Sequence, residues 1–310
     1  MKKLYGSVLL VLLPAILYAV FFFANDPHDY FGLKATPADF DSLTGHMIDL
    51  RRGDYNALLL GDSRTARVPE AYLNETTGLR FKNMSFAGCT IQEYAKLFWW
   101  AVDNHKELER VVIVTSFYGT NEILQHDRVT ATNQIIQNPV TYAFNVDSLK
   151  DLVTKLKDPG YGYPTVDINY TPEEKAANFE AYGNNLSKIL SGYSFAAEDV
   201  AELTRVCDYC NAHDIDIYFV LPAWWKEYFT KLDESGLLEQ EDSFKRELSL
   251  HAEVLDLEYP GCPLSENYDD FRDYTHARGY TLEVLCSVIA HQTISELRIW
   301  KNGNLTTNVP

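Results

Sequence analysis

The sequence predicts an α/β protein whose strands form a parallel sheet covered by helices on both faces. From Tyr55 onward, short and strongly apolar runs alternate with amphipathic stretches, which is typical of successive βαβ units. Apolar runs of this kind are expected for strands that are buried on both sides. In such sheets the ligand crevice lies beyond the carboxyl ends of the strands, so residues that follow a strand are the first candidates for function.

The alternation of apolar runs and amphipathic stretches predicts five strands and at least three helices. The expected strands cover residues 55–61, 80–85, 110–118, 216–222 and 253–258. Thr90 and Glu93 have the spacing of a capping box and predict a helix that begins there and ends near residue 105. Further helices are expected over 196–213, in segments up to 251, and over 277–299.

The N-terminal sequence indicates a membrane anchor. Residues 4–24 contain no charge, and at about 1.5 Å per residue they would span roughly 30 Å, the thickness of one hydrocarbon core. Lys2 and Lys3 would stay cytoplasmic and leave the rest of the chain outside the cytoplasm. A cleaved signal peptide is the alternative, although Phe22 stands where its cleavage site would need a small residue.

These observations divide the chain into four parts. The expected parts are an anchor over 1–24, a connector over 25–54, a catalytic domain over 55–300 and a tail over 301–310. Residues 123–195 interrupt the alternation of predicted strands and helices within the domain, and they contain many tyrosines. A long insertion of this kind is either a lid or binding surface, or a packed structural excursion.

Composition excludes some function classes. The 310 residues carry a net charge of −17, which argues against a nucleic-acid partner because phosphate binding needs clustered Lys and Arg. Cys207 and Cys210 form a lone C-x-x-C pair inside a predicted helix. A zinc ribbon would need a second pair, so we expect no metal site and no cofactor, and we interpret the two cysteines as core residues or an incidental disulfide.

A nucleophile and a base are expected at the carboxyl ends of two strands. Gly61-Asp62-Ser63 follows the first predicted strand, where Gly61 would permit a tight turn. A serine hydroxyl needs a base to take its proton, and His276 has a carboxylate, Asp273, three residues before it. His276 would accept the Ser63 proton while Asp273 orients the imidazole. Cys89 is an alternative nucleophile, but the sequence suggests no base for it.

Acyl transfer also needs hydrogen-bond donors for the developing oxyanion. Gly88 follows the second strand and Asn121 follows the third. The backbone N–H groups of Ser63 and Gly88 and the side-chain amide of Asn121 are therefore the predicted donors. Four separate segments would then deliver nucleophile, donors, acid and base to one edge of the sheet.

The order of these residues resembles the four sequence blocks of the SGNH hydrolases, also called GDSL-like esterases. Gly61-Asp62-Ser63 is similar to the first block, Asn83 to Gly88 to the second, Gly119-x-Asn121 to the third and Asp273-x-x-His276 to the last. The resemblance implies a flavodoxin-like three-layer sandwich with a five-stranded parallel sheet in the order 2-1-3-4-5. It also implies a Ser63–His276–Asp273 triad and an oxyanion hole from Ser63, Gly88 and Asn121.

The resemblance and the expected anchor together imply a serine-dependent esterase or O-acyltransferase that acts on acylated cell-envelope glycans or polymers. Anchored members of the family often work beside a multi-spanning membrane O-acyltransferase, which is the implied partner. Arg64, Trp224 and Trp225 are candidate substrate-binding residues, because aromatic faces suit sugar rings, with core packing as the alternative for the tryptophans. The alternative function is a catalytically inactive glycan-binding or scaffold protein with the same fold.

Overall fold

The computed structural model describes residues 2–33, 42–104, 107–157 and 170–306, with side chains from residue 12 onward. Residues 158–169 of the predicted insertion and 307–310 of the predicted tail lie outside the described residues. The chain forms two compact units, Met1–Arg52 with Val129–Val166, and Gly53–Arg128 with Asp167–Pro310. The predicted insertion therefore contributes to both units.

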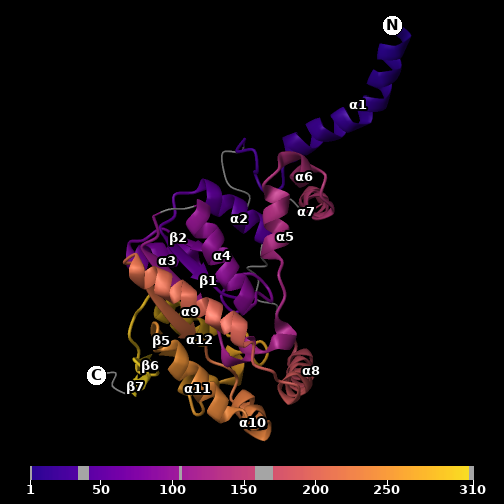
Figure 1. Ribbon diagram of the computed structural model, residues 1–310. Coiled ribbons are helices and arrows are strands. Elements are labelled where there is room, and N and C mark those ends of the chain that lie inside the picture. Colours follow the sequence, from indigo (N-terminus) through magenta and orange to yellow (C-terminus); the bar gives the residue numbers. More distant parts are fainter. Residues whose placement is uncertain (1, 34–41, 105–106, 158–169, 307–310) are drawn as a thin grey trace. The chain divides into compact units, whose positions relative to one another are not determined.

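The smaller unit is helical (Figure 1), and the fully buried Tyr142 side chain is at the centre of its aromatic contacts. The Tyr142 hydroxyl donates a 2.6 Å hydrogen bond to Asp26, and its ring stacks on Tyr30 with centroids 4.4 Å apart. Phe22 meets the same ring edge-on at 5.5 Å. The helices of this unit are α1 (Lys2–Asn25), α2 (Leu43–Arg52), α5 (Val129–Ile136), α6 (Pro139–Ala143) and α7 (Val146–Lys157).

The predicted transmembrane helix is not found. Within the part of the chain that the structure describes, no helix has both the length and the apolar character needed to cross a bilayer. The prediction rested on the uncharged run over residues 4–24, on Lys2 and Lys3 before it, and on Phe22 at the position where a cleavage site needs a small residue.

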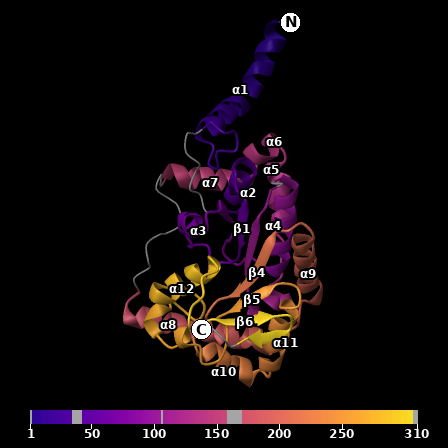
Figure 2. The same ribbon diagram turned by 90° about the vertical axis from the view of Figure 1, so that its left-hand side faces the viewer.

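The larger unit is a three-layer α/β structure with a seven-stranded sheet (Figures 1 and 2). The strand order is β2-β1-β3-β4-β5-β6-β7, in which β1 to β5 are parallel and β6 and β7 run antiparallel to their neighbours. The strands are β1 (Ala57–Leu60), β2 (Phe81–Asn83), β3 (Arg110–Val114), β4 (Asp216–Leu221), β5 (Glu253–Asp256), β6 (Arg298–Lys301) and β7 (Asn304–Thr306).

Helices cover both faces of this sheet. Figure 2 shows α4, α9 and α11 on one side and α3 and α12 on the other. The helices are α3 (Glu70–Thr77), α4 (Ile91–Asn104), α8 (Pro172–Ser191), α9 (Ala197–Ala212), α10 (Glu227–Glu234), α11 (Leu238–Leu248) and α12 (Gly279–Ile289). Four short 3-10 helices are η1 (Phe117–Thr120), η2 (Glu122–Leu124), η3 (Pro263–Ser265) and η4 (Tyr268–Asp270).

The prediction of a five-stranded, wholly parallel sheet is wrong, because a C-terminal hairpin adds two antiparallel strands. The helix expected over 277–299 ends at Ile289, and residues 298–306 form β6 and β7 instead. Asn302 and Gly303 join these strands with φ of 52° and 74°. Positive φ at both central residues matches the type I′ turn, which suits the twist of a two-residue hairpin and favours Asn-Gly. The hairpin pairs β6 with β5 and so covers an edge that would otherwise be open.

One buried cation holds the end of β5 against α11. Lys245 is about 1% exposed and lies 3.0 Å from the Glu241 carboxylate and 3.3 Å from that of Asp256. Its ammonium group also donates to the carbonyl oxygen of Glu258. Burial would lower the pKa of Lys245, but the neighbouring carboxylates raise it, so the side chain stays charged. Removing the cation would leave buried carboxyl groups without a counter-charge.

We expect Lys245→Met to destabilise the protein by about 3–5 kcal/mol, because breaking a buried ion cluster from one side leaves its acidic partners unpaired. The free energy of unfolding would be measured by urea titration. Lys150→Met is the matched control, since Lys150 is 69% exposed and should change stability by no more than about 0.5 kcal/mol. Equal effects of the two substitutions would contradict this account of the cluster.

Candidate active site

Ser63 lies on a tight turn directly after β1. The N–H groups of Thr65 and Ala66 both donate to the Asp62 carbonyl, at 3.1 and 3.2 Å. A side chain at Gly61 would clash, because its Cβ would lie 2.1 Å from the Thr65 hydroxyl. The glycine is therefore required by the close approach of the turn to the end of the strand. Ser63 projects from this turn at the carboxyl edge of the sheet.

Asp62 and Arg64, on either side of the nucleophile, bind each other. Two guanidinium nitrogens of Arg64 donate to the two carboxylate oxygens of Asp62, at 2.9 and 2.7 Å. Arg64 is only 7% exposed, and its guanidinium lies 5.5 Å from the Trp224 ring centroid. Trp224 is itself buried and stacks on Tyr228 at 4.1 Å. Arg64 and Trp224, both candidate substrate-binding residues, are thus packed in the core behind the turn that carries Ser63.

The structure brings Ser63, His276 and Asp273 together. The Ser63 hydroxyl lies 2.8 Å from Nε2 of His276, although 213 positions separate the two residues. Nδ1 of the same ring lies 2.8 Å from one Asp273 carboxylate oxygen and 2.9 Å from the other. An ionised carboxylate can only accept, so Nδ1 carries the proton and Nε2 is left to accept from the serine. This is the arrangement of a nucleophile, its base and the group that orients the base.

Asp273 also shapes the loop that carries the histidine. Its Oδ1 accepts hydrogen bonds from the backbone N–H groups of Thr275 and His276, each at 3.0 Å. Burial by itself would raise the pKa of Asp273, but the hydrogen bonds and charge of His276 and these N–H donors lower it to about 2. The carboxylate is therefore ionised at any pH at which the imidazole could act as a base.

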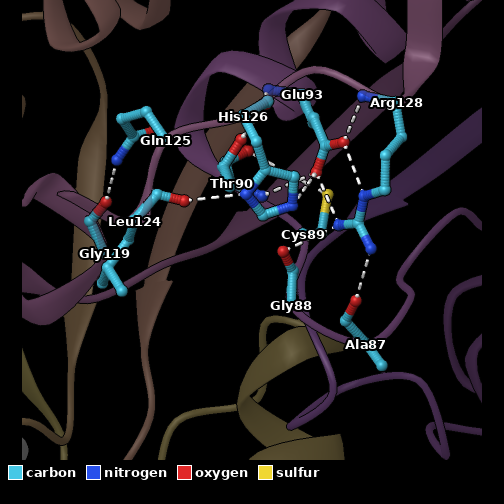
Figure 3. A network of polar contacts seen from close by, with 10 residues as sticks. All are labelled: Ala87, Gly88, Cys89, Thr90, Glu93, Gly119, Leu124, Gln125, His126 and Arg128. Carbon is cyan, nitrogen blue, oxygen red and sulfur yellow. Dashed lines mark hydrogen bonds and ion pairs between the residues drawn. The ribbon is translucent and has the colours of Figure 1, made fainter. Parts of the chain in front are cut away.

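Gly88 lies after β2 in a loop that two charged residues hold (Figure 3). Thr90 and Glu93 form the predicted capping box at the start of α4, with reciprocal bonds of 3.3 and 3.1 Å. The fully buried Glu93 carboxylate also accepts three hydrogen bonds from Arg128, between 2.8 and 2.9 Å. Glu93 thus caps its own helix and anchors an arginine that lies 35 residues downstream.

Arg128 in turn fixes the peptide groups on either side of Gly88. Its guanidinium donates to the Ala87 carbonyl at 3.0 Å and to the Gly88 carbonyl at 2.8 Å (Figure 3). Gly88 has φ of 65°, a conformation that glycine adopts without strain. Among the described residues, none accepts a hydrogen bond from the N–H of Gly88 or from that of Ser63.

Asn121, the third predicted oxyanion donor, is held by other contacts. It is fully buried, and its amide nitrogen donates to the Ile189 carbonyl of α8 at 3.2 Å. Its side-chain oxygen accepts from the N–H groups of Ile123 and Ser194, each at 3.3 Å. Asn121 lies between η1 and η2 and joins this segment to α8, and its role as an oxyanion donor stays a prediction.

The thiol of Cys89 has an environment that suppresses reactivity. Cys89 is buried, and burial raises the pKa of its thiol well above the ordinary value, with the charge of Glu93 adding to the effect. The reactive form of cysteine is the thiolate, so a neutral buried thiol is a poor nucleophile. Ser63 is the better candidate on geometry and on chemistry.

Sequence reasoning missed Arg128, and no local pattern could have revealed it. Its partners Ala87, Gly88 and Glu93 lie 35 or more residues away, so only the fold brings them together. Trp225, in contrast, was predicted as a substrate contact, and it lines a pocket beside the histidine loop.

Comparison with protein-family models and with curated proteins finds no match to this chain. Within the described residues, no group of three or more His, Cys, Asp or Glu side chains is arranged to hold a metal ion.

We expect Asp273 to stabilise the folded protein above pH 4 and to lose this effect between pH 4 and pH 2. Its pKa falls from 3.8 to about 2 on folding, so the folded state favours the ionised form by about 2 kcal/mol. Urea unfolding of wild type and of Asp273→Asn between pH 5 and pH 2.5 would measure this. The difference between the two proteins should shrink as the pH falls. Asp233→Asn, at an exposed position, should show no such trend, and a pH-independent difference at residue 273 would contradict the assignment.

Proposed function

We propose that the protein is a serine-dependent acyl ester hydrolase or O-acyltransferase. The observation that carries this proposal is the chain of hydrogen bonds from Ser63 through His276 to Asp273, at 2.8 Å for each link. The resemblance of the surrounding sequence to the SGNH hydrolases supports the same reaction class. Location outside the cytoplasm, an envelope glycan as substrate and a membrane O-acyltransferase as partner stay predictions from the sequence.

The first half of the reaction would form an acyl-enzyme. The Ser63 oxygen attacks the acyl carbon of the ester while Nε2 of His276 takes its proton. Asp273 stabilises the resulting imidazolium through its bonds to Nδ1. The imidazolium then gives the proton to the leaving alcohol as the C–O bond breaks, and the acyl group remains on Ser63.

The second half returns the enzyme to its starting state. A water molecule or an acceptor hydroxyl loses its proton to His276 and attacks the acyl carbon, and Ser63 recovers the proton as it leaves. Water gives a free acid and an acceptor alcohol gives a new ester, with the same residues in the same roles.

Each tetrahedral intermediate carries a negative oxygen that needs fixed donors. The backbone N–H groups of Ser63 and Gly88 suit this purpose, because both follow parallel strands at one edge of the sheet. Arg128 is a positioning residue in this scheme. By holding the carbonyls on either side of the Gly88 N–H, it keeps that donor in a fixed direction.

We expect Ser63→Ala to abolish turnover, since loss of a triad nucleophile costs about 10⁶ in kcat. Hydrolysis of p-nitrophenyl acetate would measure the rate, and a fluorophosphonate probe would report the nucleophile directly. Ser243→Ala, at an exposed position on α11, is the matched control and should keep both activities. Covalent labelling of wild type that persists in Ser63→Ala would overturn the assignment. Absence of labelling in folded wild type would favour the inactive scaffold.

We expect Arg128→Ala to lower kcat by about 10-fold to 100-fold with little change in KM. The Gly88 N–H would bind the oxyanion mainly in the transition state, where one such donor contributes a factor of about 10²–10³ to kcat. Without Arg128 this N–H would lose its fixed direction, so kcat should fall more than KM changes. Arg128→Lys should recover part of the rate, because one ammonium can bind one of the two carbonyls. Arg205→Ala, exposed on α9, is the control. A lower melting temperature with unchanged kcat would assign Arg128 a purely structural role.

A further inference from the structure

Helix α8 contacts the histidine loop, residues 272–276, at successive turns. Asn178 donates a hydrogen bond to the Arg272 carbonyl at 3.4 Å. One turn later, the Tyr182 ring stacks on the Tyr274 ring with centroids 6.2 Å apart. The N-terminal half of α8 therefore lies against the loop that carries the base.

The other end of α8 holds the segment that follows β3. The Ile189 carbonyl accepts from the Asn121 amide at 3.2 Å. Just beyond the helix, the Ser194 N–H donates to the Asn121 side-chain oxygen at 3.3 Å, and the Ser194 carbonyl accepts from the N–H of Glu122 at 2.8 Å. Tyr182 and Ile189 lie about 10 Å apart along the helix axis. One helix thus joins two of the four segments that resemble the SGNH blocks.

The contact at Gly183 leaves no room for a side chain. A Cβ at this position would lie 2.7 Å from the Tyr274 hydroxyl oxygen and 3.0 and 3.2 Å from two carbons of the ring. Gly183 stands inside a 20-residue helix, where glycine is less favourable than alanine. The close approach of the tyrosine ring, and not the stability of the helix, therefore accounts for a glycine here.

The Tyr274 ring is also held on its other side, by α10. Its hydroxyl donates to the Glu227 carboxylate, and its carbonyl accepts from the N–H of Trp225 at 2.9 Å. Lys231 of α10 donates to the Ser187 hydroxyl of α8 at 3.0 Å and so ties the two helices together. The ring therefore cannot move away from α8 without breaking contacts to α10.

A shift of Tyr274 would move the base. Tyr274 lies between Asp273 and Thr275, and the Asp273 carboxylate accepts from the N–H of Thr275 at 3.0 Å. The peptide group that follows Tyr274 is thus bound to the same carboxylate that orients the imidazole of His276. Nε2 of this imidazole lies 2.8 Å from the Ser63 hydroxyl, and proton transfer needs that short separation.

We propose that α8 is a positioning element of the active site, which sets the place of His276 relative to Ser63 through the contact of Gly183 with Tyr274. In this role α8 is a fixed support for the base and not a lid that moves during turnover. The proposal rests on the proposed function only where turnover is the quantity measured.

The first test is Gly183→Ala. We expect kcat for p-nitrophenyl acetate to fall by about 10-fold with KM within about 2-fold of wild type, because a base displaced by a fraction of an ångström slows proton transfer while a small ester still binds. Gly192→Ala is the matched control at the end of the same helix, where the Cβ would meet only the Lys188 carbonyl, at 3.8 Å. Far-UV circular dichroism would confirm that both variants fold. A wild-type kcat in Gly183→Ala would overturn the proposal.

The second test asks whether the tyrosine hydroxyl transmits the effect. Tyr274→Phe removes the atom that is closest to the new Cβ, while the two ring carbons stay. Gly183→Ala should therefore lower kcat by only about 3-fold when Tyr274→Phe is also present, a coupling typical of residues in contact. A general loss of stability would not depend on this hydroxyl. An equal fall in kcat with and without Tyr274→Phe would refute the contact as the cause.

The third test needs no turnover. In protein with ¹⁵N-labelled histidine, the Nε2 resonance of His276 reports the hydrogen bond that this nitrogen accepts from Ser63. Gly183→Ala should move the resonance in the direction of its position in Ser63→Ala, because both substitutions weaken the same bond. His276→Gln would assign the signal, and Gly192→Ala should leave it unchanged. A resonance that Gly183→Ala does not move would contradict the proposal.

These measurements separate the two proposals. If a fluorophosphonate labels Ser63 while Gly183→Ala matches wild type in kcat and in the Nε2 resonance, the role of α8 is refuted and the esterase is kept. If folded wild type is not labelled but Gly183→Ala moves the resonance as expected, the esterase is refuted and the positioning of His276 by α8 is kept.

Discussion

The Asp273 carboxylate connects the fold of the histidine loop to the chemistry of Ser63. It accepts bonds from the imidazole Nδ1 and from two backbone N–H groups of its own loop. Burial of a carboxylate is costly, and here these donors offset the cost and keep the charge in place. The loop conformation and the ring tautomer are therefore set by one group, and the position of Nε2 beside the serine follows from both.

The sequence could predict the triad because a parallel sheet brings its strand ends together. The strand before Ser63 is wholly apolar, the strand before the histidine loop has Val254 and Leu255 at its centre, and the carboxyl ends of both strands share one edge of the sheet. A carboxylate three residues before a histidine distinguishes His276 from the other seven histidines. The local strand pattern and the spacing of a few polar residues were enough to predict that two groups 213 positions apart in the sequence lie close together in the fold.

The parts that could not be predicted depend on contacts between distant segments. Glu93 is visible in the sequence as half of a capping box, yet its second use, in holding Arg128, arises only when the chain is folded. The role of α8 against Tyr274 likewise depends on the path of a long insertion. The C-terminal hairpin is different, because Asn302-Gly303 between two β-prone runs is a strong local signal that the continuous apolar pattern of the preceding helix obscured.

The shared loop gives the pocket a physical means to influence the reaction. Tyr274 contacts the pocket through its ring and hydroxyl, while its neighbours Asp273 and His276 carry the base and its orienting group. A substrate group that occupied the pocket would contact Tyr274 and, through it, the loop that places Nε2 beside the Ser63 hydroxyl. Binding energy from a part of the substrate that does not react would then raise kcat as well as lower KM, which is how remote contacts contribute to transition-state stabilisation. Small activated esters, which cannot fill the pocket, would bypass this contribution, so the ratio of kcat between a larger acyl ester and p-nitrophenyl acetate would measure how much the pocket adds to the triad.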